Sequence, residues 1–173
     1  MGLTIGPYTN APASYHEHDS GAPEVARLLA DAITAAGPDL SVEHIGSTAV
    51  TGCAGKGVID LMVLYPPGHL TLAKRVLDEL GFQRQATRDP FPEDRPMRVG
   101  AVAQRGRPFR VHAHVIAADS VEAAELRAFR DRLRAEPELC SAYEACKRSI
   151  LAAGVTDPVA YADAKGEFIR GSA

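Results

Sequence analysis

A glycine-rich turn between two apolar runs holds most of the residues suited to phosphate chemistry. Gly46, Ser47 and Thr48 follow the apolar-rich residues 40–45, and Lys56 precedes the next apolar run. Glycine allows close backbone approaches, while hydroxyl groups and free N–H groups at the start of a short helical turn bind phosphate oxygens. The lysine adds a mobile positive charge. This spacing predicts a phosphate cradle on the turn.

Asp60 interrupts residues 58–64, a β-branched run with the composition of a central strand. A carboxylate in a buried strand is costly unless it is paired, hydrogen-bonded or bound to a metal. The structural interpretation is an aspartate at a strand edge that caps a turn or pairs with an arginine. The functional interpretation is a magnesium ligand, because nucleotide sites combine a phosphate cradle on one turn with a metal-binding carboxylate on the next strand.

Strand alternation predicts which other side chains lie near Asp60. In the strand expected over residues 108–116, Arg110, His112 and His114 alternate with apolar residues. If the open faces of the two strands coincide, these three side chains share one cleft with Asp60. Neutral imidazoles could bind a transition metal there and protonated ones could hold phosphate, whereas hydrogen-bonded structural histidines are the alternative. The core-facing positions would then be Ile59, Leu61, Val63, Val111, Ala113 and Val115.

Several motifs together resemble the GrpB-like family of the nucleotidyltransferase superfamily. They are Glu43 to Thr48, Lys56, Ile59-Asp60, His112 to Val115, Phe129 to Arg134, Tyr143 with Lys147, and Tyr161 with Lys165. The resemblance therefore covers most of the chain. The loop departs from the family pattern, since Thr51, Cys53 and Gly57 stand where the family usually has proline, leucine and proline. We expect this loop to be less rigid than usual.

The resemblance implies a site for a nucleoside triphosphate with Mg²⁺. Its catalytic group would be Asp60, which would also hold the metal, with Glu43, His112 and His114. Its phosphate-binding group would be Gly46, Ser47, Thr48, Lys56, Arg110, Arg130, Lys147 and Lys165. Lys147 and Lys165 fall on expected helices, where solvated surface charge is the ordinary interpretation, so only the family pattern includes them.

The acidic residues fall short of the usual catalytic pattern. Catalytic members of the wider superfamily typically carry Asp-x-Asp and a third acid on a neighbouring strand, and here Met62 stands at the second position. Glu43 could complete a reduced site with Asp60. However, Glu43 and His44 are adjacent on a strand and point to opposite faces, so one of them should pack structurally.

Three functional hypotheses follow from these observations. The first is a nucleotidyltransferase-like enzyme that transfers a nucleotidyl group from a nucleoside triphosphate to a small acceptor, with Mg²⁺. The second is a non-catalytic nucleotide- or phosphate-binding module that kept the cradle but lost the metal acids. The third is a metal site built from Asp60 and the histidines.

The order of expected elements gives an α/β fold of one domain over residues 1–173. We expect a small mixed sheet with helices packed on one face, in a nucleotidyltransferase-like arrangement, followed by C-terminal helices. Residues 1–19 lack any period and predict an extended arm, and Ser20 could cap the first helix. Later elements are a helix near residues 70–80, a short strand and long loop over residues 82–98, a hairpin over residues 97–116, and helices after residues 120, 136 and 157.

Whole-chain quantities narrow the class of protein. The 173 residues carry a net charge of −3, which argues against general nucleic-acid binding. Seven arginines and three acids lie between Arg84 and Arg110, forming either a solvated face or a positive wall beside an anionic substrate. Cys53, Cys140 and Cys146 show neither a disulfide nor a zinc pattern. With no apolar signal core or bilayer-length run, these features predict a cytoplasmic protein without membrane association.

Overall fold

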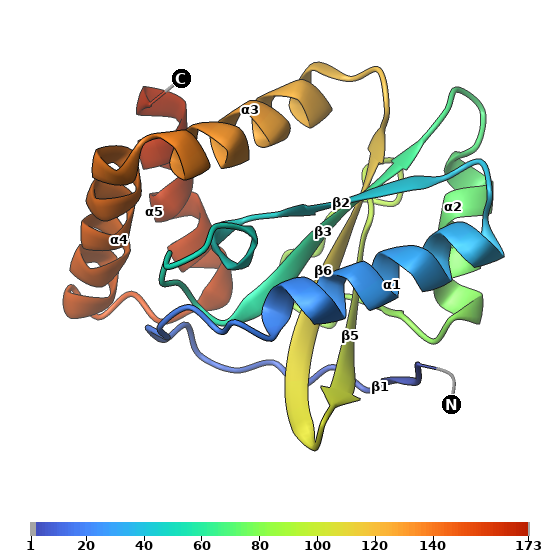
Figure 1. Ribbon diagram of the computed structural model, residues 1–173, viewed down its shortest axis with the longest axis horizontal. Coiled ribbons are helices and arrows are strands. Elements are labelled where there is room, and N and C mark those ends of the chain that lie inside the picture. The colour runs from blue at the N-terminus through green and yellow to red at the C-terminus, as the bar shows by residue number, and fades with distance from the viewer. Residues whose placement is uncertain (1–2, 173) are drawn as a thin grey trace.

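The computed structural model describes residues 3–172, which form a six-stranded mixed sheet and five α-helices (Figure 1). The strands are β1 (Ile5–Gly6), β2 (Ser41–Ile45), β3 (Val58–Tyr65), β4 (Gln83–Arg84), β5 (Met97–Gln104) and β6 (Arg107–Ala117). The helices are α1 (Ala22–Ala36), α2 (Leu70–Glu79), α3 (Val121–Ala135), α4 (Pro137–Ala152) and α5 (Pro158–Gly171), with a 3₁₀ turn η1 (Ser47–Ala49) after β2. The predicted α/β class, central hairpin and C-terminal helices are confirmed.

Strand order explains how residues far apart in sequence meet. The order is β1-β5-β6-β3-β2, with β4 also pairing with β5. Only β3 and β6 run parallel to each other, and their register places Asp60 opposite His112 and Met62 opposite His114. Paired residues on neighbouring strands project from the same face of a sheet. The side chains of Asp60, His112 and His114 therefore emerge on one face.

The opposite face of the sheet holds the main hydrophobic core. Alternate residues of β3 and β6 pack there beneath α1 and α2, which places every position expected on the core face inside this cluster: Ile59, Leu61, Val63, Val111, Ala113 and Val115. Each is no more than 1% exposed. Removing this much apolar surface from water is the main stabilising contribution to the fold.

Helices also lie on the Asp60 side of the sheet, where we expected an open face. Figure 1 shows α3, α4 and α5 gathered together at one end, separate from α1 and α2. Met62 is fully buried in a smaller cluster with Ile116 of β6 and Ala123 of α3, and Leu126 packs against it. The face is thus open around Asp60 but closed by α3 at Met62.

Side chains cap two of the C-terminal helices, whereas the cap predicted for the first helix was wrong. Ser120 accepts a hydrogen bond from the Ala123 N–H, and Asp157 caps α5 in the same way. Ser20 does not cap α1, because the helix begins one residue later and Gly21 occupies the cap position.

The described part of the predicted N-terminal arm, residues 3–19, is extended and packs along the domain, while residues 1–2 lie outside the described part of the chain. Ile5 and Gly6 pair with β5, and the backbone of His16 exchanges two hydrogen bonds with Gly55. The arm therefore crosses from the far edge of the sheet to the glycine-rich loop. No helix within residues 3–172 combines the length and apolar character needed to cross a membrane.

Candidate functional site

Asp60, His112 and His114 form a compact cluster on the sheet. Asp60 Oδ1 lies 3.3 Å from His112 Nδ1 and 3.6 Å from His114 Nε2. Burial opposes the charged carboxylate, but the two imidazoles and Lys56 outweigh this effect and hold the pKa of Asp60 well below its usual range. Burial lowers the pKa of His112, with Asp60 acting in the opposite direction. The cluster is therefore an ionised carboxylate beside a histidine that favours its neutral form.

Gly46 allows the turn after β2 to approach this carboxylate. Its φ is +73°, and a Cβ at this position would lie 2.7 Å from Asp60 Oδ2. Any other residue would therefore meet both an unfavourable backbone conformation and a steric overlap. The glycine predicted for a phosphate cradle is required here by its approach to Asp60.

Lys56 and Arg110 bring positive charge to the same place. Burial lowers the pKa of Lys56 to about 8, and Asp60 opposes this shift. The Arg110 guanidinium donates to the Lys56 carbonyl at 3.4 Å. Neither side chain forms an ion pair with another part of the chain between residues 3 and 172. Both cations are therefore available to an anionic ligand.

The cluster opens into a cleft of about 460 Å³. Gly46, Lys56, Asp60, Arg110, His112 and His114 line it, together with Lys165 and Arg130 from the C-terminal helices. Tyr8 of the N-terminal arm and Phe91 of the long loop complete the wall. A volume of this size is within the usual range for small-molecule sites, roughly 300–1,000 Å³.

Sequence reasoning missed Tyr8 and Phe91, which approach the two histidines from outside the sheet. The Tyr8 hydroxyl lies 2.8 Å from His112 Nε2, and burial raises the pKa of this tyrosine. The Phe91 ring packs edge-on against His114 with centroids 5.7 Å apart. Neither residue stands in a periodic pattern, so the sequence offered no signal for either contact.

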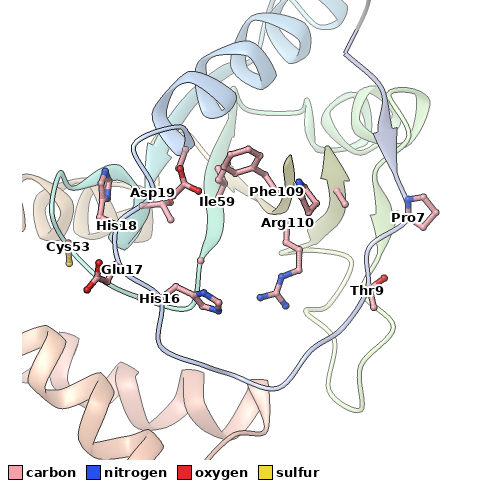
Figure 2. Close-up of a pocket in the computed structure, with 16 residues that line it drawn as sticks. Pro7, Thr9, His16, Glu17, His18, Asp19, Cys53, Ile59, Phe109 and Arg110 are labelled. Atoms are coloured by element: carbon pink, nitrogen blue, oxygen red, sulfur yellow. The ribbon is translucent and has the colours of Figure 1, made fainter. Parts of the chain in front are cut away.

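A second cavity of about 630 Å³ lies on the other side of Arg110, beneath the N-terminal arm. Figure 2 shows the Arg110 side chain extending into the space enclosed by the arm, with His16 across from it. Thr48 and Gly55 also line this cavity. Arg110 thus borders both spaces.

Comparison with known proteins places the chain in a family. Residues 13–172 match the family model described as GrpB protein. The chain belongs to the GrpB protein family. It is 34% identical over 143 residues to the UPF0157 protein SCO7215 of Streptomyces coelicolor, which covers 83% of this chain and 70% of that relative. It is 33% identical over 133 residues to the UPF0157 protein PA4798 of Pseudomonas aeruginosa, covering 76% of this chain but only 53% of that relative.

Solved structures show the same fold in a wider set of proteins. GrpB from Enterococcus faecalis matches with a TM-score of 0.65 at 20% identity, over 92% of this chain and 99% of the other. A structure of Cid1 with its short product ApU matches with a TM-score of 0.50 at 13% identity, over 78% of this chain and 42% of the other. A second Cid1 structure concerns RNA terminal uridylyl transferase activity. The GrpB fold is therefore nucleotidyltransferase-like in architecture.

The predicted phosphate cradle of this GrpB chain lies only partly in the cleft. Of Gly46, Ser47 and Thr48, only Gly46 lines the cleft. Thr48 is buried, with Oγ1 2.9 Å from His44 Nε2 and a 3.4 Å hydrogen bond to the Val58 carbonyl. Ser47 packs so closely against Gly55 that its Oγ occupies the space a Cβ would need there. Both hydroxyl groups therefore support the loop.

Glu43 does not join Asp60 as a second acid. Its carboxylate receives hydrogen bonds of 2.5–3.2 Å from Arg127 and one of 2.9 Å from Arg130. These bonds, with burial acting against them, lower the pKa of Glu43. Arg130 also contacts Asp131 and the His44 carbonyl. Glu43 and Arg130 thus connect β2 to α3, which leaves Arg130 less available to a ligand than Lys56 or Arg110.

Lys147 is buried, contrary to both interpretations made for it. It is 2% exposed, donates to the Ala54 carbonyl, and lies 4.2 Å from the centre of the Tyr143 ring. Its hydrogen bond to Ala54 holds the glycine-rich loop in place, and it is not among the residues lining the cleft. Lys165, by contrast, lines the cleft, with its ammonium 6.0 Å from the Tyr161 ring centre.

The arginine-rich segment does not form a positive wall. Five of its seven arginines have acidic partners: Arg84 with Glu93, Arg95 with Glu122, Arg98 with Asp78 and Glu93, Arg105 with Glu24, and Arg107 with Asp19. Arg98 is 1% exposed and pairs with both of its acids. Of the seven, Arg110 is the one that lines the cleft.

The donor set around Asp60 does not fit magnesium as a resident ion. Magnesium requires oxygen ligands in near-ideal octahedral geometry. In the part of the chain that the structure describes, the groups gathered around Asp60 are two imidazoles, and no second carboxylate joins them. Met62 fills the position of the second acid, and Glu43 is held by arginines.

Proposed function

We propose that this GrpB protein binds a phosphate-bearing small molecule, in the first instance a nucleoside triphosphate, in the cleft over β3 and β6. The observation that carries the proposal is the convergence of Lys56 and Arg110 on one cleft beside Gly46 and Asp60. Asp60 is near enough to Lys56 for the two groups to shift each other's pKa, but among residues 3–172 neither cation forms a close ion pair with a carboxylate. Charge-assisted hydrogen bonds from such groups to phosphate are among the strongest contacts available to a protein.

The rest of the cleft supports a ligand with an apolar part. Phe91 and Phe129 line the same cavity, and Phe91 is 41% exposed. An exposed aromatic ring offers a face on which a nucleobase can stack. Phosphates beside Lys56 and Arg110 with a base near the aromatic residues would use both the charged and the aromatic side chains of the cleft.

The activity suggested by the likeness to Cid1 is transfer of a nucleotidyl group to a small acceptor. In that reaction the acceptor hydroxyl oxygen forms a bond to the α-phosphorus, the bond to the leaving oxygen breaks, and pyrophosphate departs. With no metal ion on the imidazoles, His112 or His114 would take the proton from the acceptor hydroxyl. The lowered pKa of His112 favours the neutral form that this role needs.

A non-catalytic binding module is the second candidate, and Met62 is the observation that favours it. With the second acid replaced by a buried side chain, the cleft keeps cations for phosphate but lacks the usual carboxylate pair. Pyrophosphate release from labelled ATP or UTP, with and without candidate hydroxyl acceptors, separates the two candidates.

The binding proposal is tested by comparing nucleotides with nucleosides. ATP, UTP, adenosine, uridine and tripolyphosphate would be titrated into the protein by calorimetry. Replacing Lys56 by methionine should weaken the binding of the triphosphates by about tenfold or more, because a hydrogen bond to a charged group contributes roughly 1.5–3 kcal/mol. The nucleosides should be unaffected. Lys74→Met is the matched control, since Lys74 lies in α2 and pairs with Glu93.

Two results would contradict the proposal. One is that none of these triphosphates binds at millimolar concentration. The other is that Lys56→Met weakens nucleosides and nucleotides equally, which would remove phosphate recognition from Lys56.

A further inference from the structure

The side chains of Asp60, His112 and His114 approach one another without forming good hydrogen bonds. One nitrogen of each imidazole points to Asp60 Oδ1: His112 Nδ1 lies 3.3 Å away and His114 Nε2 lies 3.6 Å away. A good N–H···O bond is about 2.9 Å long, and 3.6 Å is too far for one. One ligand atom from each residue lies within 4.8 Å of the others. Ligands about 2.1 Å from a common metal ion are separated by distances on the order of 3–3.5 Å.

The outer nitrogen of His112 also favours coordination over a purely structural role. Tyr8 binds His112 through Nε2, which leaves Nδ1 directed at Asp60. Metal-binding histidines are commonly held in this way by a partner on the other nitrogen. His114 Nδ1 is buried and has no hydrogen-bond partner among the described residues. Among the described residues, the outer-nitrogen contact that is typical of a metal-binding histidine is thus present for His112 and not for His114.

The chemistry of the donors selects the class of ion. Two imidazoles and one carboxylate suit divalent transition metals, whereas magnesium prefers oxygen ligands. Catalytic zinc sites commonly use three protein ligands and leave a fourth position open. Here the cluster lines the same cleft as Lys56 and Arg110, so an open position would be accessible from that cleft.

We propose that Asp60 Oδ1, His112 Nδ1 and His114 Nε2 bind a divalent transition-metal ion of the zinc class in preference to magnesium. The ion is held by the chain's own side chains, so the proposal does not require nucleotide binding. Tyr8 acts as a positioning residue that orients His112. An ion at this point would attract a phosphate or carboxylate group into the cleft.

The direct test measures Zn²⁺, Co²⁺ and Mg²⁺ binding to chelator-treated, tag-free full-length protein by calorimetry. We expect one equivalent of Zn²⁺ or Co²⁺, bound at least 100-fold more tightly than Mg²⁺. Co²⁺ should show the visible ligand-field bands of nitrogen coordination, and zinc should shift the ring NMR signals of His112 and His114. These measurements use the unmodified protein, so they hold even if a variant fails to fold.

Matched variants then assign the ion to these residues. His114→Gln should lower zinc affinity by at least tenfold, and Tyr8→Phe should lower it by about tenfold, as for other outer partners of metal-binding histidines. His69→Gln is the control, because His69 also faces an aspartate, with Nε2 3.6 Å from Asp39 Oδ2, but lies outside the cleft. Its removal should change nothing.

Among residues 3–172 there is one other group of ligand atoms, and it gives the outcome that would overturn the proposal. Cys53, Cys140 and Glu144 also lie close enough to hold an ion. Zinc binding that survives His114→Gln but is lost in Cys140→Ser would place the ion there. Equal affinity for Zn²⁺ and Mg²⁺, or no binding of zinc at all, would equally refute the assignment.

Discussion

Replacing Lys147 by methionine should destabilise the fold while leaving ligand affinity unchanged. The ammonium is 2% exposed, donates to the Ala54 carbonyl, and lies 4.2 Å from the Tyr143 ring centre. The charge-assisted hydrogen bond contributes roughly 1.5–3 kcal/mol, and the contact with the ring contributes about 0.5–2 kcal/mol. The cost of burying the ammonium, which lowers the pKa of Lys147, offsets part of this.

The net loss of unfolding free energy should therefore be about 2 kcal/mol. In a domain of this size each kcal/mol moves the melting temperature by roughly 2–4 °C, so we expect a decrease of about 4–8 °C. Urea unfolding followed by circular dichroism gives the free energy directly. Nucleotide affinity, measured on the folded variant, should stay within about twofold of the unsubstituted protein, because Lys147 does not line the cleft.

Lys165→Met is the matched control and should behave in the opposite way. Lys165 lines the cleft and lies at the longer distance of 6.0 Å from an aromatic ring centre. Its loss should cost less than about 0.5 kcal/mol, as for most surface substitutions, and should weaken triphosphate binding. If Lys147→Met instead leaves stability intact and weakens phosphate binding, Lys147 is a ligand and the support assigned to it is wrong.

Two further predictions concern the turn beside Asp60. Burial lowers the pKa of His44 to about 4, against an ordinary value of 6.5, with Asp60 opposing the shift. Between pH 4 and pH 6.5 the imidazole is therefore protonated in the unfolded chain but neutral in the folded chain. Because the unfolded state binds this proton, the free energy of unfolding falls as pH decreases. The loss between pH 7 and pH 5 should be about 2 kcal/mol in urea unfolding, and His44→Gln should remove that increment; an unchanged pH dependence in the variant would refute this origin. Gly46→Ala should lower the free energy of unfolding more than Gly52→Ala. Both glycines have a positive φ, so both variants carry backbone strain. Only at position 46 would the added Cβ lie 2.7 Å from Asp60 Oδ2, whereas a Cβ at position 52 would have nothing within 4 Å. Equal losses of thermal stability in the two variants would show that the contact with Asp60 is unimportant.

Alternation made part of this site predictable. Side chains alternate across a strand, so an aspartate and two histidines at the polar positions of two apolar strands had to share a face once the strands paired in register. The observed pairing of Asp60 with His112 meets that condition. The core positions of both strands followed from the same rule.

Other parts of the site depend on contacts that no local period encodes. Tyr8 reaches His112 from an aperiodic arm, and Glu43 is neutralised by arginines of a helix more than eighty residues away. Lys147 is different, because a signal was present. It lies four residues after Tyr143 and eight after Leu139, on the stripe of α4 that faces inward, so its helical position predicted burial even though its charge suggested the surface.

The absence of a second acid next to Asp60 follows from how α3 packs on the sheet. Met62 projects from the same face as Asp60, but α3 covers it in a cluster with Ile116, Ala123 and Leu126, where its exposure is zero. A carboxylate at that position would be buried among apolar side chains at a cost of several kcal/mol. The open part of the face is instead bordered by His112 and His114 on the neighbouring strand. Because the packing of α3 excludes the acid and the parallel pairing with β6 supplies the imidazoles, the protein's own ligand atoms in this cleft favour an ion that accepts nitrogen ligands.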